Sequence, residues 1–168
     1  MMNLKHDNLY VAYGSNLNHR GMKLRCPDAV FLGTTMVREH RLVFRGVADI
    51  VKAKDMRCPV GVWEITPKCE ASLDRYEGVG AGLYRKELVQ FDDGKRALVY
   101  AMNDCGIHVP SALYFETIEQ GYRHCGLDTD PLYEALRHAK RYQRPTKTIM
   151  TNMERRANRD PRHSRLVV

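Results

Sequence analysis

The sequence predicts an α+β fold: a small mixed or mostly antiparallel β-barrel with a few peripheral helices. Segments typical of strands and helices follow one another without regular alternation, which disfavours a doubly wound parallel sheet. One hairpin is signalled clearly by Asp93-Gly94, which lies between two apolar segments. A chain of 168 residues, of which 43% are hydrophobic and 28% charged, has the length and composition of one globular domain.

The first expected strand leads directly into a turn. The run Leu9-Tyr10-Val11-Ala12-Tyr13 is apolar and aromatic, as buried strands are, and it ends at Gly14-Ser15-Asn16. Ser and Asn are frequent at helix starts, so a short helix is expected over 18–25, ended by Cys26-Pro27. The further strand segments expected are 29–45, as one long bent strand or as two that break near Gly33, then 47–51 and, after a polar connection over 52–56, 59–65.

The second half of the chain opens with a helix. Thr66-Pro67 is a helix-start signal, with Thr as the N-cap and Pro as the first helical residue, and the helix is expected to end near Tyr76, before Gly78. The glycine-rich loop 78–82 follows this helix and precedes a strand, which is the reverse of a dinucleotide-binding turn. The remaining expected elements are strands over 83–91 and 97–102 and helices over 111–126 and 131–142.

Positive charge is concentrated at the C-terminal end. The formal net charge of the chain is +7, but residues 137–168 alone carry ten Lys and Arg against two acidic residues, a net charge of +8. We therefore expect a domain over 1–144 and a basic tail over 145–168 that is flexible or laid over the surface. Nucleic-acid contact through this tail is an alternative that we do not favour, because the segment has no recognisable motif.

The cysteines and histidines predict no metal site. Five cysteines without a Cys-x-x-Cys pair indicate neither a disulfide framework nor a zinc ribbon, and the seven histidines are scattered. No apolar run approaches the roughly 20 residues that span a bilayer, and the N-terminal residues lack the apolar core of a signal peptide. We expect a cytoplasmic protein without a metal, a cofactor or membrane contact.

Two stretches carry groups suited to chemistry. A strand that turns sharply into a helix leaves backbone N–H groups without partners, and Gly14 lets a ligand approach the backbone, so the first turn can bind an anion. Glu77 lies between a helix end and the glycine loop, where desolvation by Tyr76 and Tyr84 would raise its pKa and suit it to proton transfer. On spacing alone, an ordinary junction and a solvated Glu before a glycine cap are simpler interpretations.

Taken together, two motifs resemble the γ-glutamylcyclotransferase family. The first is Tyr13-Gly14-Ser15-Asn16-Leu17, and the second, about sixty residues later, is Leu73-Asp74-x-x-Glu77-Gly78-Val79-x-x-Gly82-x-Tyr84. The order continues with a strand hairpin and a helix that bears Tyr114. The similarity covers roughly residues 9–136 and leaves out the tail. The loop has the Ser-Asn form, whereas the γ-glutamylamine branch of the family typically has Tyr-Gly-Thr-Leu.

The resemblance implies a fold, an activity and a set of site residues. The implied reaction is intramolecular aminolysis, in which the α-amine of a γ-glutamyl amino acid or γ-glutamyl amine attacks its own γ-carbonyl and gives 5-oxoproline plus the free amino acid or amine. Glu77 is expected to act as base and then as acid, while backbone N–H groups hold the γ-glutamyl group. The residues expected to contact the substrate are Tyr13, Gly14, Ser15, Asn16, Leu17, Tyr84 and Tyr114.

One alternative function and three further properties stay open. A non-catalytic module on the same fold could use the loop to bind a small anion, although a carboxylate that faces such a ligand would oppose binding. The resemblance also leaves open a homodimer, the identity of the released amine or amino acid, and whether glutathione is a substrate.

Overall fold

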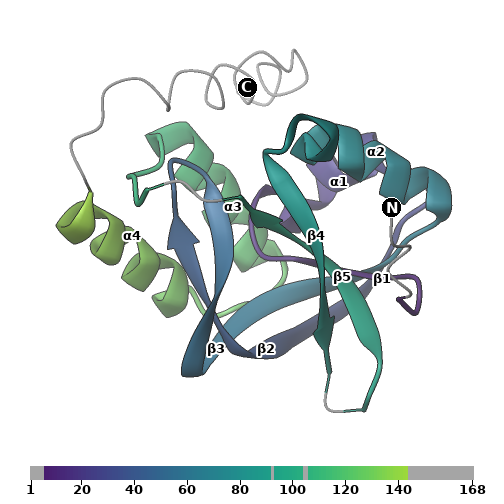
Figure 1. Ribbon diagram of the computed structural model, residues 1–168, viewed down its shortest axis with the longest axis horizontal. Helices are drawn as coiled ribbons and strands as arrows, with labels where there is room; N and C mark the ends of the chain where they lie inside the picture. Colours follow the sequence, from purple (N-terminus) through teal and green to yellow (C-terminus); the bar gives the residue numbers. More distant parts are fainter. Residues whose placement is uncertain (1–5, 92, 104–105, 144–168) are drawn as a thin grey trace.

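The structure is a computed structural model that describes residues 6–91, 93–103 and 106–143 (Figure 1). Its elements in chain order are β1 (Leu9–Ala12), the 3-10 turn η1 (Ser15–Leu17), α1 (His19–Arg25), β2 (Val30–Phe44), β3 (Ala48–Glu64), α2 (Pro67–Glu77), the 3-10 turn η2 (Val79–Ala81), β4 (Tyr84–Gln90), β5 (Arg96–Met102), α3 (Ala112–His124) and α4 (Asp130–Tyr142). The tail predicted over 145–168 lies outside the described residues. Within them, no helix is both long and apolar enough to cross a bilayer.

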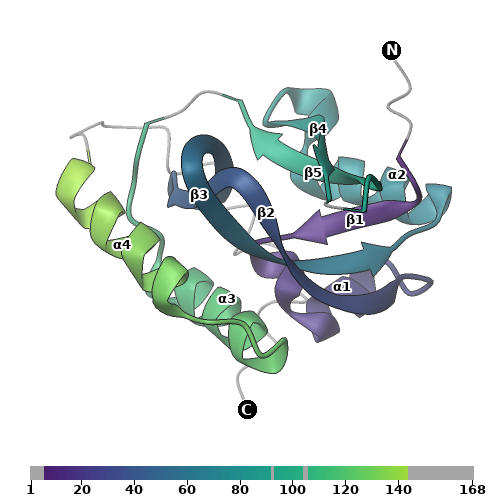
Figure 2. The same cartoon turned by 90° about the horizontal axis from the view of Figure 1, so that it is seen from below.

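The strands form one five-stranded mixed sheet in the order β2-β3-β1-β5-β4. Strand β1 runs parallel to β5, and the other neighbouring pairs are antiparallel. The predicted α+β class and mixed sheet are therefore confirmed. The description as a barrel is too strong: among the described strands, β4 pairs with β5 and not with β2, so the sheet is bent but not closed (Figures 1 and 2).

Strands β2 and β3 form one long hairpin, which corrects the expected boundaries. Pairing runs from Val30 opposite Glu64 to Phe44 opposite Ala48, with register shifts near Gly33 and farther along the hairpin. The segment 52–56, predicted as a polar connection, lies inside β3. Polar residues are compatible with a strand here because one face of the hairpin is exposed, and the backbone ladder does not require apolar side chains on that face.

The ends of the helices that carry Glu77 and Tyr114 follow local sequence, as predicted. Thr66 caps the start of α2 by accepting a backbone N–H at 3.2 Å. Gly78 adopts a φ of 69° directly after α2, a left-handed conformation that favours glycine. Ser111 caps α3 in the same way as Thr66, at 3.3 Å. These caps fix the positions of Glu77, at the end of α2, and of Tyr114, in the first turn of α3.

The helices lie in two groups beside the sheet. Helices α3 and α4 lie beside the β2–β3 hairpin, whereas α1 and α2 lie together near β1 (Figures 1 and 2). Helix α3 also packs on η1, and it does so closely at Gly121. A Cβ added there would lie 2.7 Å from Leu17 Cβ and 3.0 Å from the backbone nitrogen of Asn18. Helix α3 therefore supports the η1 turn through this close contact of Gly121 with Leu17 and Asn18.

We expect Gly121→Ala to destabilise the protein by about 1–3 kcal/mol, although alanine is the better helix former. The added methyl group has no room against Leu17, so either α3 or the η1 turn must move. Urea unfolding of the variant and the wild type measures the difference. Gly80→Ala is the matched control, since a Cβ at Gly80 meets no atom within 4 Å. Equal stability of Gly121→Ala and the wild type would contradict this packing.

Candidate active site

A small cavity of about 30 Å³ lies where β1 ends and η1 begins. It is lined by residues from segments far apart in the sequence, namely Tyr10, Tyr13, Gly14, Ser15, Asn16, Ala48, Glu77, Tyr84, Tyr100 and Tyr114. The turn expected to bind an anion and the glutamate expected to carry a proton therefore face the same cavity. Three tyrosines expected to contact the substrate line it as well.

A hydrogen bond joins the two sequence motifs directly. Asn16, in η1, donates its Nδ2–H to Glu77 Oε1 at 3.1 Å and also lies 2.8 Å from Tyr10 Oη, which accepts from the same nitrogen. Glu77 reaches this position because it is the last residue of α2, before the left-handed Gly78. Its carboxyl group is thus held against the η1 turn rather than directed into solvent.

The surroundings of the Glu77 carboxyl raise its pKa to about 7. Burial is the main cause, because it disfavours the ionised form, while the charge of Arg25 and the hydrogen bond from Asn16 act in the opposite direction. Glu77 as a whole residue is only partly buried. The part that is removed from water is the carboxyl end of its side chain. Near neutral pH both protonation states are populated, which lets one group accept a proton and return it.

We expect Glu77→Gln to be more stable than the wild type by about 1–3 kcal/mol at pH 8. The folded-state pKa of about 7 lies above the ordinary 4.5, so the folded protein binds more protons than the unfolded chain between these values. The stability of the wild type therefore falls as the pH rises through this window, whereas glutamine does not titrate. Urea unfolding at pH 8 and at pH 4 checks this, with exposed Glu64→Gln as the control. A variant less stable at pH 8 would contradict it.

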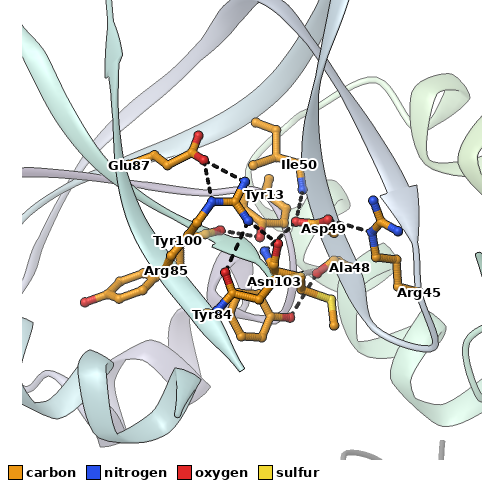
Figure 3. A network of polar contacts seen from close by, with 11 residues as sticks. Tyr13, Arg45, Ala48, Asp49, Ile50, Tyr84, Arg85, Glu87, Tyr100 and Asn103 are labelled. Atoms are coloured by element: carbon orange, nitrogen blue, oxygen red, sulfur yellow. Dashed lines mark hydrogen bonds and ion pairs between the residues drawn. The ribbon is translucent and has the colours of Figure 1, made fainter. Parts of the chain in front are cut away.

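The backbone of Ala48 holds two of the tyrosines in place. Tyr84 Oη donates to the Ala48 carbonyl oxygen at 3.1 Å (Figure 3), and the Ala48 N–H donates to Tyr114 Oη at 3.1 Å. Tyr13 Oη donates to the carbonyl oxygen of Tyr100 at 2.5 Å. Burial raises the pKa of Tyr13, Tyr84 and Tyr114, so these hydroxyls stay protonated at neutral pH.

A buried carboxylate anchors Ala48 in turn. Asp49 is 1% exposed, and its Oδ1 accepts the N–H groups of Ile50 at 2.9 Å and Met102 at 2.8 Å, while Arg45 Nε donates to Oδ2 at 2.8 Å (Figure 3). Burial raises the pKa of Asp49, and these three hydrogen bonds favour the ionised form. Asp49 thereby ties β3 to β5 beside the cavity and fixes the Ala48 peptide that the tyrosines contact.

One of the expected substrate contacts lies apart from the others. Leu17 is fully buried, does not line the cavity, and uses its backbone N–H to donate to the Gly14 carbonyl oxygen at 3.0 Å. The sequence reasoning also missed Tyr10, Tyr100 and Ala48. Tyr10 lies in the same aromatic run as Tyr13, which was a usable signal, but nothing local in the sequence indicates that Ala48 or Tyr100 reaches this cavity.

The comparisons with known proteins agree with this fold. Residues 10–121 match the family model described as Gamma-glutamyl cyclotransferase, AIG2-like. The Gamma-glutamylcyclotransferases of Bos taurus and Homo sapiens are each 30% identical over an alignment of 135 residues, and the match covers 71% of this chain and 72% of theirs. A solved structure described as Gamma-glutamyl cyclotransferase has a TM-score of 0.64 at 25% identity, covering 89% of this chain and 98% of that one. An uncharacterised Homo sapiens protein has a TM-score of 0.64 at 28% identity, covering 83% and 90%.

The fold and the cavity thus define an α+β protein with one desolvated carboxyl group among tyrosine hydroxyls. The chain belongs to the Gamma-glutamyl cyclotransferase, AIG2-like family, and it is an enzyme of this type. The resemblance read from the two motifs is confirmed.

Proposed function

We propose that this protein is a γ-glutamylcyclotransferase that converts a γ-glutamyl amino acid or γ-glutamyl amine to 5-oxoproline and the free amino acid or amine. Relatives in its family carry the name of this activity. The main support from the chain itself is the Glu77 carboxyl, with a pKa of about 7 and a hydrogen bond of 3.1 Å to the η1 turn. A module that only binds anions would gain nothing from a carboxyl group at this place.

In the proposed reaction, Glu77 moves the protons. Its carboxylate takes a proton from the substrate α-ammonium, and the resulting amine attacks the γ-carbonyl carbon. The new C–N bond closes a five-membered ring, and an oxyanion forms on the carbonyl oxygen. Protonated Glu77 then donates to the departing nitrogen as the old C–N bond breaks. It next removes the excess proton from the ring nitrogen and passes it to the released amine, which restores the carboxylate.

The η1 turn and Tyr114 are the proposed donors to the substrate. The turn has no side-chain cap, and the first N–H groups of such a turn, here those of Ser15 and Asn16, have no acceptor within it. Tyr114 accepts from the Ala48 N–H, so its own O–H can donate. Donors that are already positioned stabilise an oxyanion without reorganisation during the reaction. The proposal does not use the Leu17 N–H, because that group is bonded to Gly14.

The substrate would have to widen the cavity. A volume of about 30 Å³ has room for water but not for a γ-glutamyl group. We propose that the tyrosine side chains move apart on binding and that Glu77 loses its remaining contact with water. Each broken hydrogen bond of Tyr84 or Tyr114 to Ala48 costs about 1 kcal/mol, which substrate contacts can offset.

The experiment that tests the proposal is a product assay. The purified protein is incubated with γ-glutamyl amino acids, γ-glutamyl amines and glutathione, and 5-oxoproline is measured by mass spectrometry. We expect 5-oxoproline from at least one of these compounds. Binding of a γ-glutamyl compound by calorimetry, without turnover of any member of the panel, would favour the anion-binding module instead.

A further inference from the structure

Arg25, the last residue of α1, is a buried arginine without a role in the reaction above. It is 8% exposed, which is unusual for arginine. Gly21, four residues earlier on the same helix, makes room for the guanidinium: a Cβ at Gly21 would lie 2.8 Å from Arg25 Nη1. A glycine inside a helix is destabilising, so the helix is weakened where it must accommodate this buried side chain.

The guanidinium packs on a tyrosine and has no carboxylate of the described part of the chain in direct contact. Its Cζ lies 3.9 Å from the centroid of the Tyr76 ring, and its Nη2 donates to Tyr76 Oη at 2.8 Å. Its Nε and Nη1 are buried without a hydrogen-bond partner among the described residues. A buried cation with so few partners is costly, so a negative charge close by would stabilise it.

We infer that Arg25 is a positioning residue of the active site, acting from outside the cavity on Glu77 by its charge and on the η1 turn through Tyr76. Tyr76 touches both partners directly, because its Oη lies 2.8 Å from Arg25 Nη2 and 3.3 Å from Ser15 Oγ. Arg25 itself is not among the residues that line the cavity. This inference rests on the proposed function, since it concerns the same proton transfer.

The other ionisable groups around Glu77 supply no positive charge. Among the described residues they are the hydroxyls of Tyr10 and Tyr13 at β1, Tyr76 on α2, Tyr84 on β4, Tyr100 on β5 and Tyr114 on α3, together with the Asp49 carboxylate on β3, which acts on Tyr13 and Tyr84. Arg25 is the cation whose charge lowers the pKa of Glu77 against the effect of burial. Without it, the carboxylate would form only at higher pH.

The pH dependence of activity tests the electrostatic role. In Arg25→Met, we expect the acid limb of kcat/KM to move up by about one pH unit. At pH 6.5 this lowers kcat/KM about tenfold, and at pH 8.5 the value recovers to within about threefold of the wild type. Arg25→Lys keeps the charge and should leave the limb in place. The matched control is Arg20→Met, which removes an exposed charge from the same helix. It should change neither the position of the acid limb nor kcat/KM at pH 6.5.

Tyr76→Phe separates the two roles. It retains the ring and the Arg25 charge but removes the oxygen that reaches Ser15, so we expect a raised KM with an unmoved acid limb. A limb that moves in Tyr76→Phe as far as in Arg25→Met would overturn the assignment of the charge effect to Arg25.

The titration of the Glu77 carboxyl by carbon-13 NMR gives a readout that needs no activity. We expect a higher pKa in Arg25→Met, or in Arg25→Gln if the methionine variant does not fold. An unchanged Glu77 titration would overturn the inference. If Glu77→Gln is inactive while the Arg25 variants titrate like the wild type, only this inference fails. If Glu77→Gln retains full activity, the assignment of Glu77 as the proton carrier fails, and the role of Arg25 fails with it. If the wild type releases no 5-oxoproline from any γ-glutamyl compound, the proposed function itself fails.

Discussion

Replacement of Glu77 by Gln is expected to lower kcat for 5-oxoproline release by about 10²- to 10⁴-fold, which is the usual contribution of a general acid–base group. Glutamine keeps the size of the side chain and can still accept the hydrogen bond from Asn16. It cannot take a proton from the α-ammonium or return one to the departing nitrogen. KM should change little, because the η1 turn and the tyrosines remain.

Steady-state kinetics on the best γ-glutamyl substrate measures both constants. Glu64→Gln is the matched control, because it makes the same chemical change at an exposed position in β3. Its kcat should stay within about twofold of the wild type, as expected for a change away from the reacting atoms. A Glu77→Gln enzyme that keeps its kcat within about tenfold of the wild type would assign the proton transfer to another group.

Replacement of Gly14 by Val is expected to lower kcat/KM by about 10²-fold or more. A Cβ at Gly14 would lie 3.0 Å from Ala48 Cβ and 3.7 Å from Tyr114 Oη, and the valine methyl groups need still more room. Because the Ala48 backbone holds Tyr84 and Tyr114, a displaced Ala48 moves two walls of the cavity at once. The same methyl groups block approach to the η1 backbone.

The control for Gly14→Val is Gly80→Val, in the nearby η2 turn, where an added Cβ meets no atom within 4 Å. Circular dichroism and thermal denaturation establish that both variants are folded before kinetics are measured. We expect kcat/KM to fall in Gly14→Val, to fall less in Gly14→Ala and to stay unchanged in Gly80→Val. Unchanged substrate affinity and turnover in folded Gly14→Val would mean that the loop is only a turn.

Local signals predict the fold where one or two residues decide the backbone. Thr66 caps α2 as expected, the helix expected from residue 111 begins at Ala112 with Ser111 as its cap, and Gly78 ends α2 in the left-handed conformation. The polar segment 52–56 is different, because what makes it a strand is its pairing with residues of β2 far away in the chain. Closure of the sheet is likewise a property of two distant edges, and no local pattern specifies it.

In the candidate site, too, some residues are marked by local sequence and others are brought in only by the fold. Glu77 and the η1 turn lie in compact motifs, so their resemblance to a family identifies them from the sequence. Ala48 contributes only its backbone and Cβ, and Arg25 reaches the η1 turn only through Tyr76, so neither side chain marks a site by its type. Such residues become visible only when the fold brings their partners together.

The measurement that tests the central claim most directly is the pH dependence of kcat/KM for 5-oxoproline release from below pH 4.5 to above pH 7. If the Glu77 carboxyl is the base, its protonation inactivates the enzyme, so kcat/KM should fall tenfold per pH unit below an apparent pKa of about 7. A profile that stays flat across this range, or that breaks near the ordinary carboxyl pKa of 4.5, would contradict a desolvated Glu77 as the proton carrier.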